Sequence, residues 1–189
     1  GSYEQRAQLA GRLPWIAEVT NPRELTGSLA DAVAGADVFI GVSAGNILTA
    51  EDVASMAERS IVFAMANPVP EIDPAEAVRH AEVVATGRSD FANQINNVLA
   101  FPGVFRGLLD AQASAVSDKM LLAAARALAD VVTADELNPT YIVPSVFHDG
   151  VTKAVASAVE QVAREELGTV DTITGAMPAV YADEITFEN

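Results

Sequence analysis

Three short apolar runs, separated by capped helices, constrain the fold of this chain more than any other feature. The runs are ADVFIGVS (36–43), SIVFAMA (60–66) and AEVVATG (81–87), and they are rich in β-branched residues. Runs of this length and composition are typical of strands that are buried on both faces. Strands that alternate with short helices predict parallel pairing with right-handed crossovers. The sequence therefore predicts an α/β fold.

Local capping signals mark where the helices between these strands begin. Thr49 is predicted to be an N-cap, with Asp52 three positions on, for a helix that reaches about Glu58. Asp73, which precedes a proline, is predicted to be the N-cap of the helix after the second run. Ser28 is predicted to cap a short helix before the first run. Each crossover thus carries its own start signal.

Helices are also predicted on both sides of this series. Before it, two helical pieces are expected, the second of which restarts at Pro14. After Pro102 the chain is expected to turn helical, with amphipathic helices over 117–132 and 149–167. The tail from Gly168 is predicted to be irregular. The C-terminal helices are expected to cover the sheet.

Neutral polar groups follow each predicted strand. The three loops are SAGN (43–46), NPVPE (67–71) and GRSDFANQINN (87–97). In parallel sheets, ligands bind outside the carboxyl ends of the strands. A carboxamide both donates and accepts hydrogen bonds, so it can bind a polar ligand without adding charge. Asparagine is also common in turns, and composition alone leaves both interpretations open.

Several familiar catalytic patterns are missing from the sequence. It contains neither GxGxxG nor GxxxxGK[ST], the loops that bind dinucleotides and nucleotide phosphates. No nucleophile elbow is expected among the serines. His80 and His148 are far apart, and the two lysines are expected on solvated helix faces. We therefore expect no catalytic residue and no metal ligand within this chain.

Composition excludes several classes of partner. The 189 residues carry a formal net charge of -15, which is unfavourable for binding nucleic acid or an anionic membrane surface. No apolar run approaches the roughly 20 residues that span a bilayer, and no signal-peptide layout is visible. The sequence has no cysteine, which fits a reducing compartment. We expect a cytoplasmic protein with neither nucleic acid nor membrane as partner.

Four motifs together resemble one family. ADVFIGVSAGNILT, VFAMANPVPEI, VVATGRSDFANQINNVLAFPGVFRGLLD and YIVPSVF closely resemble the NAD(P)-binding domain of bacterial malic enzymes, in order from about residue 21 to residue 166. The resemblance implies oxidative decarboxylation of malate to pyruvate and CO2, with NAD or NADP and with Mg2+ or Mn2+. NAD is preferred. A malolactic-type enzyme, or a non-catalytic nucleotide- or acid-binding fragment that needs a partner chain, remains an alternative.

The resemblance also implies a set of site residues. Asn67 and Asn97 would contact both substrate and cofactor, and Asn96 would contribute on the cofactor side. Ser43 and Ala44 would form a wall beside the cofactor.

Three further polar residues of the same loops receive other assignments. Asn93, like Asn96, is expected to shape its loop. Arg88 is also expected to act in loop structure. Asn46 is not assigned, because GN at 45–46 departs from the proline-containing form of the family motif.

Length is the main departure from the family pattern. The family's catalytic tyrosine and lysine, its metal-binding acids and its glycine-rich loop all precede the matched region. The expected fold is a Rossmann-like parallel sheet that lacks its first β-α-β unit, with a helical C-terminal cover. Residues 1–167 would form a partial NAD(P)-binding domain and residues 168–189 a C-terminal tail. The expected partners are the missing N-terminal half and further copies, in a homodimer or higher oligomer.

Overall fold

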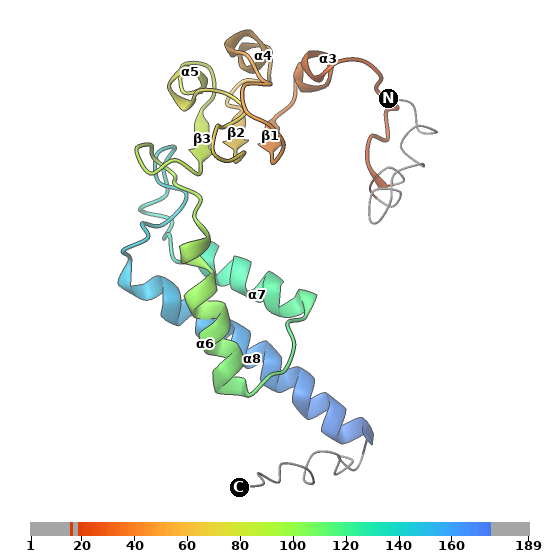
Figure 1. The fold of residues 1–189 in the computed structure, drawn as a ribbon, viewed down its shortest axis with the longest axis vertical. Helices are drawn as coiled ribbons and strands as arrows, with labels where there is room; N and C mark the ends of the chain where they lie inside the picture. Colours follow the sequence, from red (N-terminus) through yellow and green to blue (C-terminus); the bar gives the residue numbers. More distant parts are fainter. Residues whose placement is uncertain (1–15, 17–18, 175–189) are drawn as a thin grey trace, which may run out of the picture. The chain divides into compact units, whose positions relative to one another are not determined.

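The computed structural model describes residue 16 and residues 19 to 174 of the chain (Figure 1). These residues divide into two compact units. The first holds the described residues up to Ile95 together with Leu137–Val143, and the second holds Asn96–Glu136 and the residues from Pro144 onward. The helical pieces predicted around Pro14 lie almost entirely outside the described residues.

The first unit is built on a parallel sheet of three strands. The strands are β1 (Val38–Gly41), β2 (Ile61–Ala64) and β3 (Val83–Thr86), in the order β1-β2-β3. Both pairs are parallel and in simple register, so that Ile40 lies opposite Phe63 and Phe63 opposite Ala85. All three predicted strands are confirmed, and with them the α/β fold class.

Three short helices occupy the positions that the capping signals predict. They are α3 (Leu29–Val33), α4 (Ala50–Ala54) and α5 (Pro74–Ala77). Ser28 and Thr49 each form a complete capping box, with Asp31 and Asp52 respectively. Asp73 accepts from the Ala75 N–H at the start of α5. The helix after Thr49 is shorter than predicted, since α4 ends at Ala54 and not near Glu58.

The core of the first unit lies between the strands and these helices. In Figure 1, α3, α4 and α5 lie in a row along one side of the sheet. The core consists of Val33, Phe39, Leu48, Val53, Met56, Val62, Ala64, Ile72, Ala77, Ala81 and Val84. Burial alternates along β1, where Val38 and Ile40 are 47% and 62% exposed. The expectation of burial on both faces is therefore wrong for β1, because within the first unit the helices α3, α4 and α5 form a layer on one face.

The second unit is helical. It contains the single turn η1 (Asn97–Leu99), α6 (Phe101–Ala111), α7 (Asp118–Ala129) and α8 (Asp149–Thr174). Both α6 and α7 pack against α8, and Ser117 caps α7 as predicted. The helices expected after Pro102 are confirmed. That they cover the sheet stays a prediction.

The expectation of an irregular tail from Gly168 is wrong for the first residues of that segment. The last helix, α8, continues through Gly168 to Thr174. A glycine inside a helix costs about 1 kcal/mol relative to alanine. That cost is too small to end a helix that 19 preceding residues already support.

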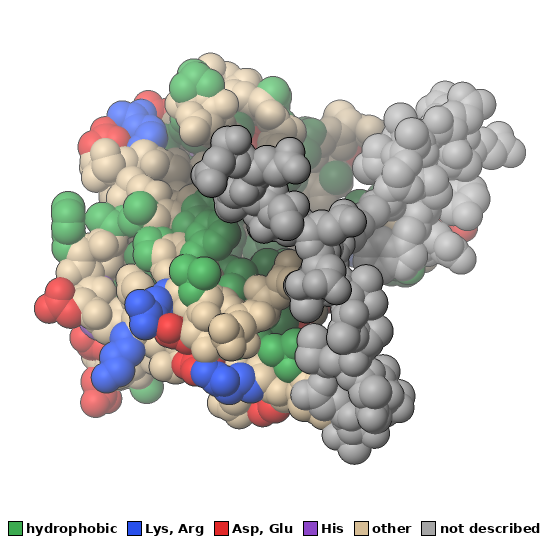
Figure 2. Space-filling model, turned by 60° about the horizontal axis from the view of Figure 1, so that its bottom comes forward, with side chains coloured by type: hydrophobic (Ala, Val, Ile, Leu, Met, Phe, Trp, Pro, Cys, Tyr) green, Lys and Arg blue, Asp and Glu red, His purple; other side chains and the backbone are tan. Residues whose placement is uncertain are grey.

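Apolar side chains also reach the surface of the molecule. Figure 2 shows one face on which hydrophobic side chains lie open among polar ones. On α6, the exposed apolar residues Phe101, Phe105 and Leu109 recur every four positions, and the two phenyl rings stack with centroids 6.0 Å apart. No described helix is both long and apolar enough to cross a membrane.

The contact between α6 and α8 depends on glycine. A Cβ atom at Gly103 would lie 2.6 Å from the Val155 Cβ, and one at Gly107 would lie 2.5 Å from the Ala156 carbonyl oxygen. The two helix backbones can therefore approach closely only where α6 has no side chain.

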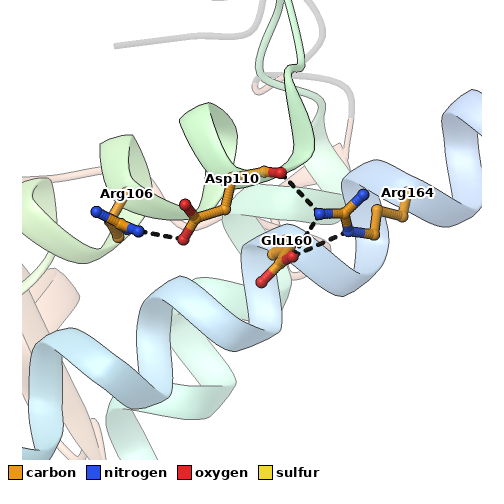
Figure 3. A network of polar contacts seen from close by, with 4 residues as sticks. All are labelled: Arg106, Asp110, Glu160 and Arg164. Atoms are coloured by element: carbon orange, nitrogen blue, oxygen red, sulfur yellow. Dashed lines mark hydrogen bonds and ion pairs between the residues drawn. The ribbon is translucent and has the colours of Figure 1, made fainter.

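Polar contacts join the same two helices at the surface (Figure 3). The Arg164 guanidinium donates to the Asp110 carbonyl oxygen at 2.7 Å and also pairs with Glu160 on its own helix. The Asp110 carboxylate accepts from Arg106 Nε at 2.7 Å. The two arginine side chains are largely exposed and the two carboxylates partly exposed, so these ion pairs contribute little to the stability of the fold.

Gly107→Ala is expected to lower the free energy of unfolding of the protein by about 1–3 kcal/mol, because the added methyl group forces α6 away from α8. Gly168→Ala is the matched control, since a Cβ there would meet, within 4 Å, no atom of the described residues beyond its own helical turns. The control is expected to raise stability by up to about 1 kcal/mol. Denaturant unfolding of both variants measures the difference. Equal stability of Gly107→Ala and the wild type would contradict the close packing.

Candidate functional site at the carboxyl edge of the sheet

Two loops leave the carboxyl ends of β1 and β2 and run against each other. The ladder between these strands ends with the bond from the Met65 N–H to the Gly41 carbonyl oxygen, at 3.1 Å. Further on, Asn46 N–H donates to the Pro70 carbonyl and Leu48 N–H to the Glu71 carbonyl, both at 3.0 Å. The backbone of the first loop is thus held by that of the second.

A buried carboxylate joins the same two loops. Glu71 is fully buried, at 0% exposure. Its Oε1 accepts from the Ser43 N–H and its Oε2 from the Ala66 N–H, each at 3.0 Å. A side chain at Gly41 would overlap the Glu71 carboxyl group, so the strand leaves room for it.

Sequence reasoning missed this role of Glu71. In this part of the sequence, only the helix cap at Asp73 is predicted, and the structure confirms it. A usable signal was present: Glu71 is the single charged residue in the stretch from Ile61 to Ile72. An acid in so apolar a segment, directly after a buried strand, indicates a buried and hydrogen-bonded carboxylate.

Three of the five predicted site residues lie at this edge. Ser43 and Ala44 follow β1 and are exposed, and Asn67 follows β2 and is also exposed. The peptide bond from Asn67 to Pro68 is cis. Among the described residues, the Asn67 carboxamide has no hydrogen-bond partner. The edge thus presents a hydroxyl, a methyl group and an amide, none of which carries charge.

The letters from Gly41 to Gly45, GVSAG, match the GxSxG pattern of a nucleophile elbow, which the sequence analysis overlooked. Such an elbow is a sharp strand-to-helix turn with a strained serine. Here α4 begins only at Ala50, and Ser43 is not among the residues with positive φ. Its N–H is also bound by Glu71. The geometry does not support a serine nucleophile.

The loop after β3 contains an internal ion pair. Arg88 donates through Nε and Nη2 to the two carboxylate oxygens of Asp90, at 2.9 and 2.6 Å. The guanidinium also lies over the Phe91 ring, 4.8 Å from its centroid. The hydrogen bond from Arg88 lowers the pKa of Asp90 below its ordinary value. Arg88 therefore supports its own loop, as predicted.

Asn93 is buried and fully engaged. It is 6% exposed and has a φ of 54°, a left-handed conformation that asparagine tolerates. Its Nδ2 donates to the carbonyl oxygens of Val84 and Pro139, at 3.0 and 2.8 Å, and its Oδ1 accepts from the Ile142 N–H at 2.8 Å. It thereby ties the segment Leu137–Val143 to the sheet. The loop-shaping role predicted for Asn93 is confirmed.

Asn96 and Asn97 begin the second unit, so the structure does not place them relative to the sheet edge. Asn96 is the N-cap of η1, and its Oδ1 accepts from the Val98 N–H at 3.0 Å. Asn97 is exposed, and its carboxamide has no hydrogen-bond partner among the described residues. The two neighbouring amides therefore differ: one shapes the turn and the other is available to a ligand.

The edge suits the nicotinamide end of a cofactor better than its phosphates. The three charged residues in the loops after the strands are already engaged: Glu71 accepts from backbone N–H groups, and Arg88 and Asp90 pair with each other. The remaining groups are neutral donors and acceptors, which match a carboxamide ring. Within the described part of the chain, no three histidine, aspartate or glutamate side chains are grouped to hold a metal ion.

Comparisons with known proteins agree with this geometry. Residues 14–164 match the family model described as malic enzyme, NAD binding domain. The NAD-dependent malic enzyme of Geobacillus stearothermophilus is 61% identical over 78% of this chain and 31% of its own length. The bifunctional malic/malolactic enzyme of Bacillus subtilis is 52% identical over 79% of this chain and 37% of its own.

Solved structures show the same relationship. The crystal structure of malic enzyme from Pyrococcus horikoshii superimposes with a TM-score of 0.78 at 40% identity, and covers 85% of this chain and 37% of that one. The chain thus spans about a third of the length of the two curated relatives named above. Because the family model matches residues 14–164, most of the chain, the chain belongs to the malic enzyme family, and this range resembles the NAD-binding domain of that family.

Proposed function

We propose that this chain is part of an enzyme that oxidatively decarboxylates malate to pyruvate and CO2 with NAD and a divalent metal ion. The observation that carries the proposal is the neutral edge at the end of β1 and β2, where Ser43, Ala44 and Asn67 are exposed in a matched NAD-binding domain. Two relatives with high identity are named malic enzymes, one of them NAD-dependent.

Each proposed contact follows from the chemistry of a carboxamide. Asn67 and Asn97 would orient the malate carboxylate and the nicotinamide carboxamide, with Asn96 on the cofactor side. Ser43 and Ala44 would form a wall beside the ring. A neutral amide can orient an anionic substrate without adding a charge that would offset the charge of the metal ion. A bond of this kind is worth roughly 1 to 3 kcal/mol when buried. When bound, the nicotinamide would accept the hydride from C2 of malate.

The remaining parts of the site are assigned to residues outside this chain. We place the Mg2+ or Mn2+ ligands, the acid/base pair and the phosphate-binding loop in an N-terminal half of the protein. NAD is proposed over NADP, although the relatives include enzymes named for each. We also propose a cytoplasmic homodimer or higher oligomer, which light scattering of the full-length protein would test against a monomer.

Steady-state assays of the full-length protein with malate, NAD and Mn2+ test the proposed function. Equimolar NADH and pyruvate are expected. Lactate without net NADH would favour the malolactic alternative, which the name of the B. subtilis relative makes specific. The 189-residue chain alone is the control and is expected to be inactive. Absence of any malate turnover by the full-length protein would contradict the proposal.

A further inference from the structure

Just beyond the last bond of the sheet ladder, the two loops that leave β1 and β2 are joined by a side chain. Up to Gly41 and Met65, backbone groups of the two strands bond each other directly. Beyond that point, the N–H groups of Ser43 and Ala66 both turn to the Glu71 carboxylate. Direct backbone bonds between the loops resume only further on, where the Asn46 and Leu48 N–H groups donate to the Pro70 and Glu71 carbonyl oxygens. In the interval that holds Ser43 and Asn67, the hydrogen bonds between the two loops run through the Glu71 carboxylate.

Burial of the Glu71 carboxylate, which accepts from two N–H groups, carries a desolvation cost. Removing a charged group from water is costly unless hydrogen bonds compensate it. Within the described part of the chain, no lysine, arginine or histidine pairs with Glu71. Its two backbone bonds are charge-assisted, and such bonds are stronger than bonds between neutral groups. Each loop is therefore held firmly at the residue whose N–H donates to Glu71, Ser43 in the first loop and Ala66 in the second.

The surroundings of Glu71 show that its place is specific. Glycine at 41 leaves the space that its carboxyl group fills. Glycine at 45 lets the first loop pass Val69, whose side chain a Cβ would meet at 2.7 Å. Gly41 ends β1 and Gly45 lies in the loop after it, so the two glycines flank Ser43 and Ala44. The two glycines therefore allow the first loop to approach the second as closely as the Glu71 carboxyl group and the Val69 side chain require.

We propose that Glu71 is a positioning residue, which fixes the Ser43–Ala44 loop relative to the Asn67 turn so that one nicotinamide can contact both. The inference rests on the proposed function and deepens it. Glu71 itself does not touch the ligand in this account. It acts through the two backbone segments that it holds, one after each strand.

The Glu71→Gln variant of the full-length protein tests this role. Glutamine has nearly the same shape but only one oxygen acceptor, so one of the two N–H groups would face an NH2 group. Loss of one bond to a charged group predicts a KM for NAD raised about 10- to 100-fold. The kcat at saturating NAD is expected to stay within about threefold, because the acid/base and metal chemistry is unaffected.

A second variant and a control separate positioning from simple stability. Gly41→Ala pushes against the same carboxyl group from the strand side and is expected to raise the KM for NAD in the same direction. Val53→Ala removes a core side chain that is 1% exposed and belongs to α4 and not to either loop. The control is expected to lower the melting temperature while it leaves the KM for NAD unchanged.

A purely structural role would make Glu71→Gln behave like Val53→Ala. An unchanged KM for NAD in folded Glu71→Gln would therefore overturn the inference. If that variant does not fold at the assay temperature, an unchanged KM in folded Gly41→Ala overturns it instead. Calorimetric titration with NAD distinguishes this failure from that of the proposed function. A wild-type protein that binds NAD but does not turn over malate contradicts the function alone, while weaker NAD binding by Glu71→Gln still supports the role of Glu71.

Discussion

Asn97→Ala is expected to lower kcat/KM for malate in the full-length protein by about 30- to 1,000-fold, which corresponds to about 2 to 4 kcal/mol of transition-state stabilisation. The Asn97 side chain is exposed and has no hydrogen-bond partner among the described residues. Removal of the Asn97 carboxamide is therefore expected to change the free energy of unfolding little. The expected damage arises because a buried group of the ligand would lose the amide that binds it.

Asn96→Ala is the matched control for this prediction. It removes the adjacent amide, which accepts from the Val98 N–H and caps η1. Loss of such a cap costs about 0.5 to 2 kcal/mol of stability, with a smaller effect on kcat/KM than Asn97→Ala. Asn67→Ala is expected to resemble Asn97→Ala, with a larger share of the effect in the KM for the cofactor. Steady-state kinetics and melting curves of the three variants provide the test, and a larger kinetic defect in folded Asn96→Ala would reverse the assignment.

Asn93→Ala is expected to lower the free energy of unfolding by about 2 to 4 kcal/mol, with kcat/KM within a few fold of the wild type. The substitution leaves three backbone groups without their partner, at Val84, Pro139 and Ile142. A buried group left unsatisfied costs about 1 to 3 kcal/mol, and partial access of water at Pro139 and Ile142 reduces the sum.

Denaturant unfolding of Asn93→Ala, beside Asn96→Ala, measures this effect. Asn96 has one local contact at an exposed turn, whereas Asn93 joins segments 46 and 49 residues apart in the sequence. A stability loss in Asn93→Ala no greater than that of Asn96→Ala would contradict the scaffold role. A fall in kcat/KM greater than that of Asn97→Ala, in folded protein, would show that Asn93 contacts the ligand.

The elements that the sequence predicts well are those with local signals. Ser28, Thr49 and Ser117 each bond a backbone N–H three residues on, so their effect is complete within one helical turn. The three strands were equally visible, because each is a short apolar run bounded by turn residues. Together these signals predicted the order of strands and helices and hence the parallel sheet.

The features that the sequence could not predict depend on contacts between distant segments. The hydrogen bond from the Ser43 N–H to Glu71 spans 28 residues, and no periodic pattern in the sequence predicts it. The attachment of Leu137–Val143 to the sheet through Asn93 is of the same kind. The open face of β1 was also missed, because an apolar run does not say how many layers of helix cover it. These errors concern packing partners more than secondary structure.

The run of amides shows which side-chain roles can be predicted from the sequence and which require the structure. Asn93, Asn96 and Asn97 are chemically identical and lie within five positions. In the structure one is buried among backbone groups, one caps a helical turn, and one has no described partner. Resemblance to the family singled out Asn97. Only the hydrogen bonds show that the other two are already engaged.

A crystal structure of the full-length protein with NAD and oxalate, an unreactive dicarboxylate, tests the central claim most directly. We expect the nicotinamide ring at the carboxyl edge of the sheet, with Ser43 and Ala44 beside it. The carboxamides of Asn67 and Asn97 should lie within hydrogen-bond distance of the ring or of oxalate. Glu71 should keep its bonds to the Ser43 and Ala66 N–H groups. A nicotinamide bound away from the loops after β1 and β2, with Asn67 and Asn97 still facing solvent, would contradict it.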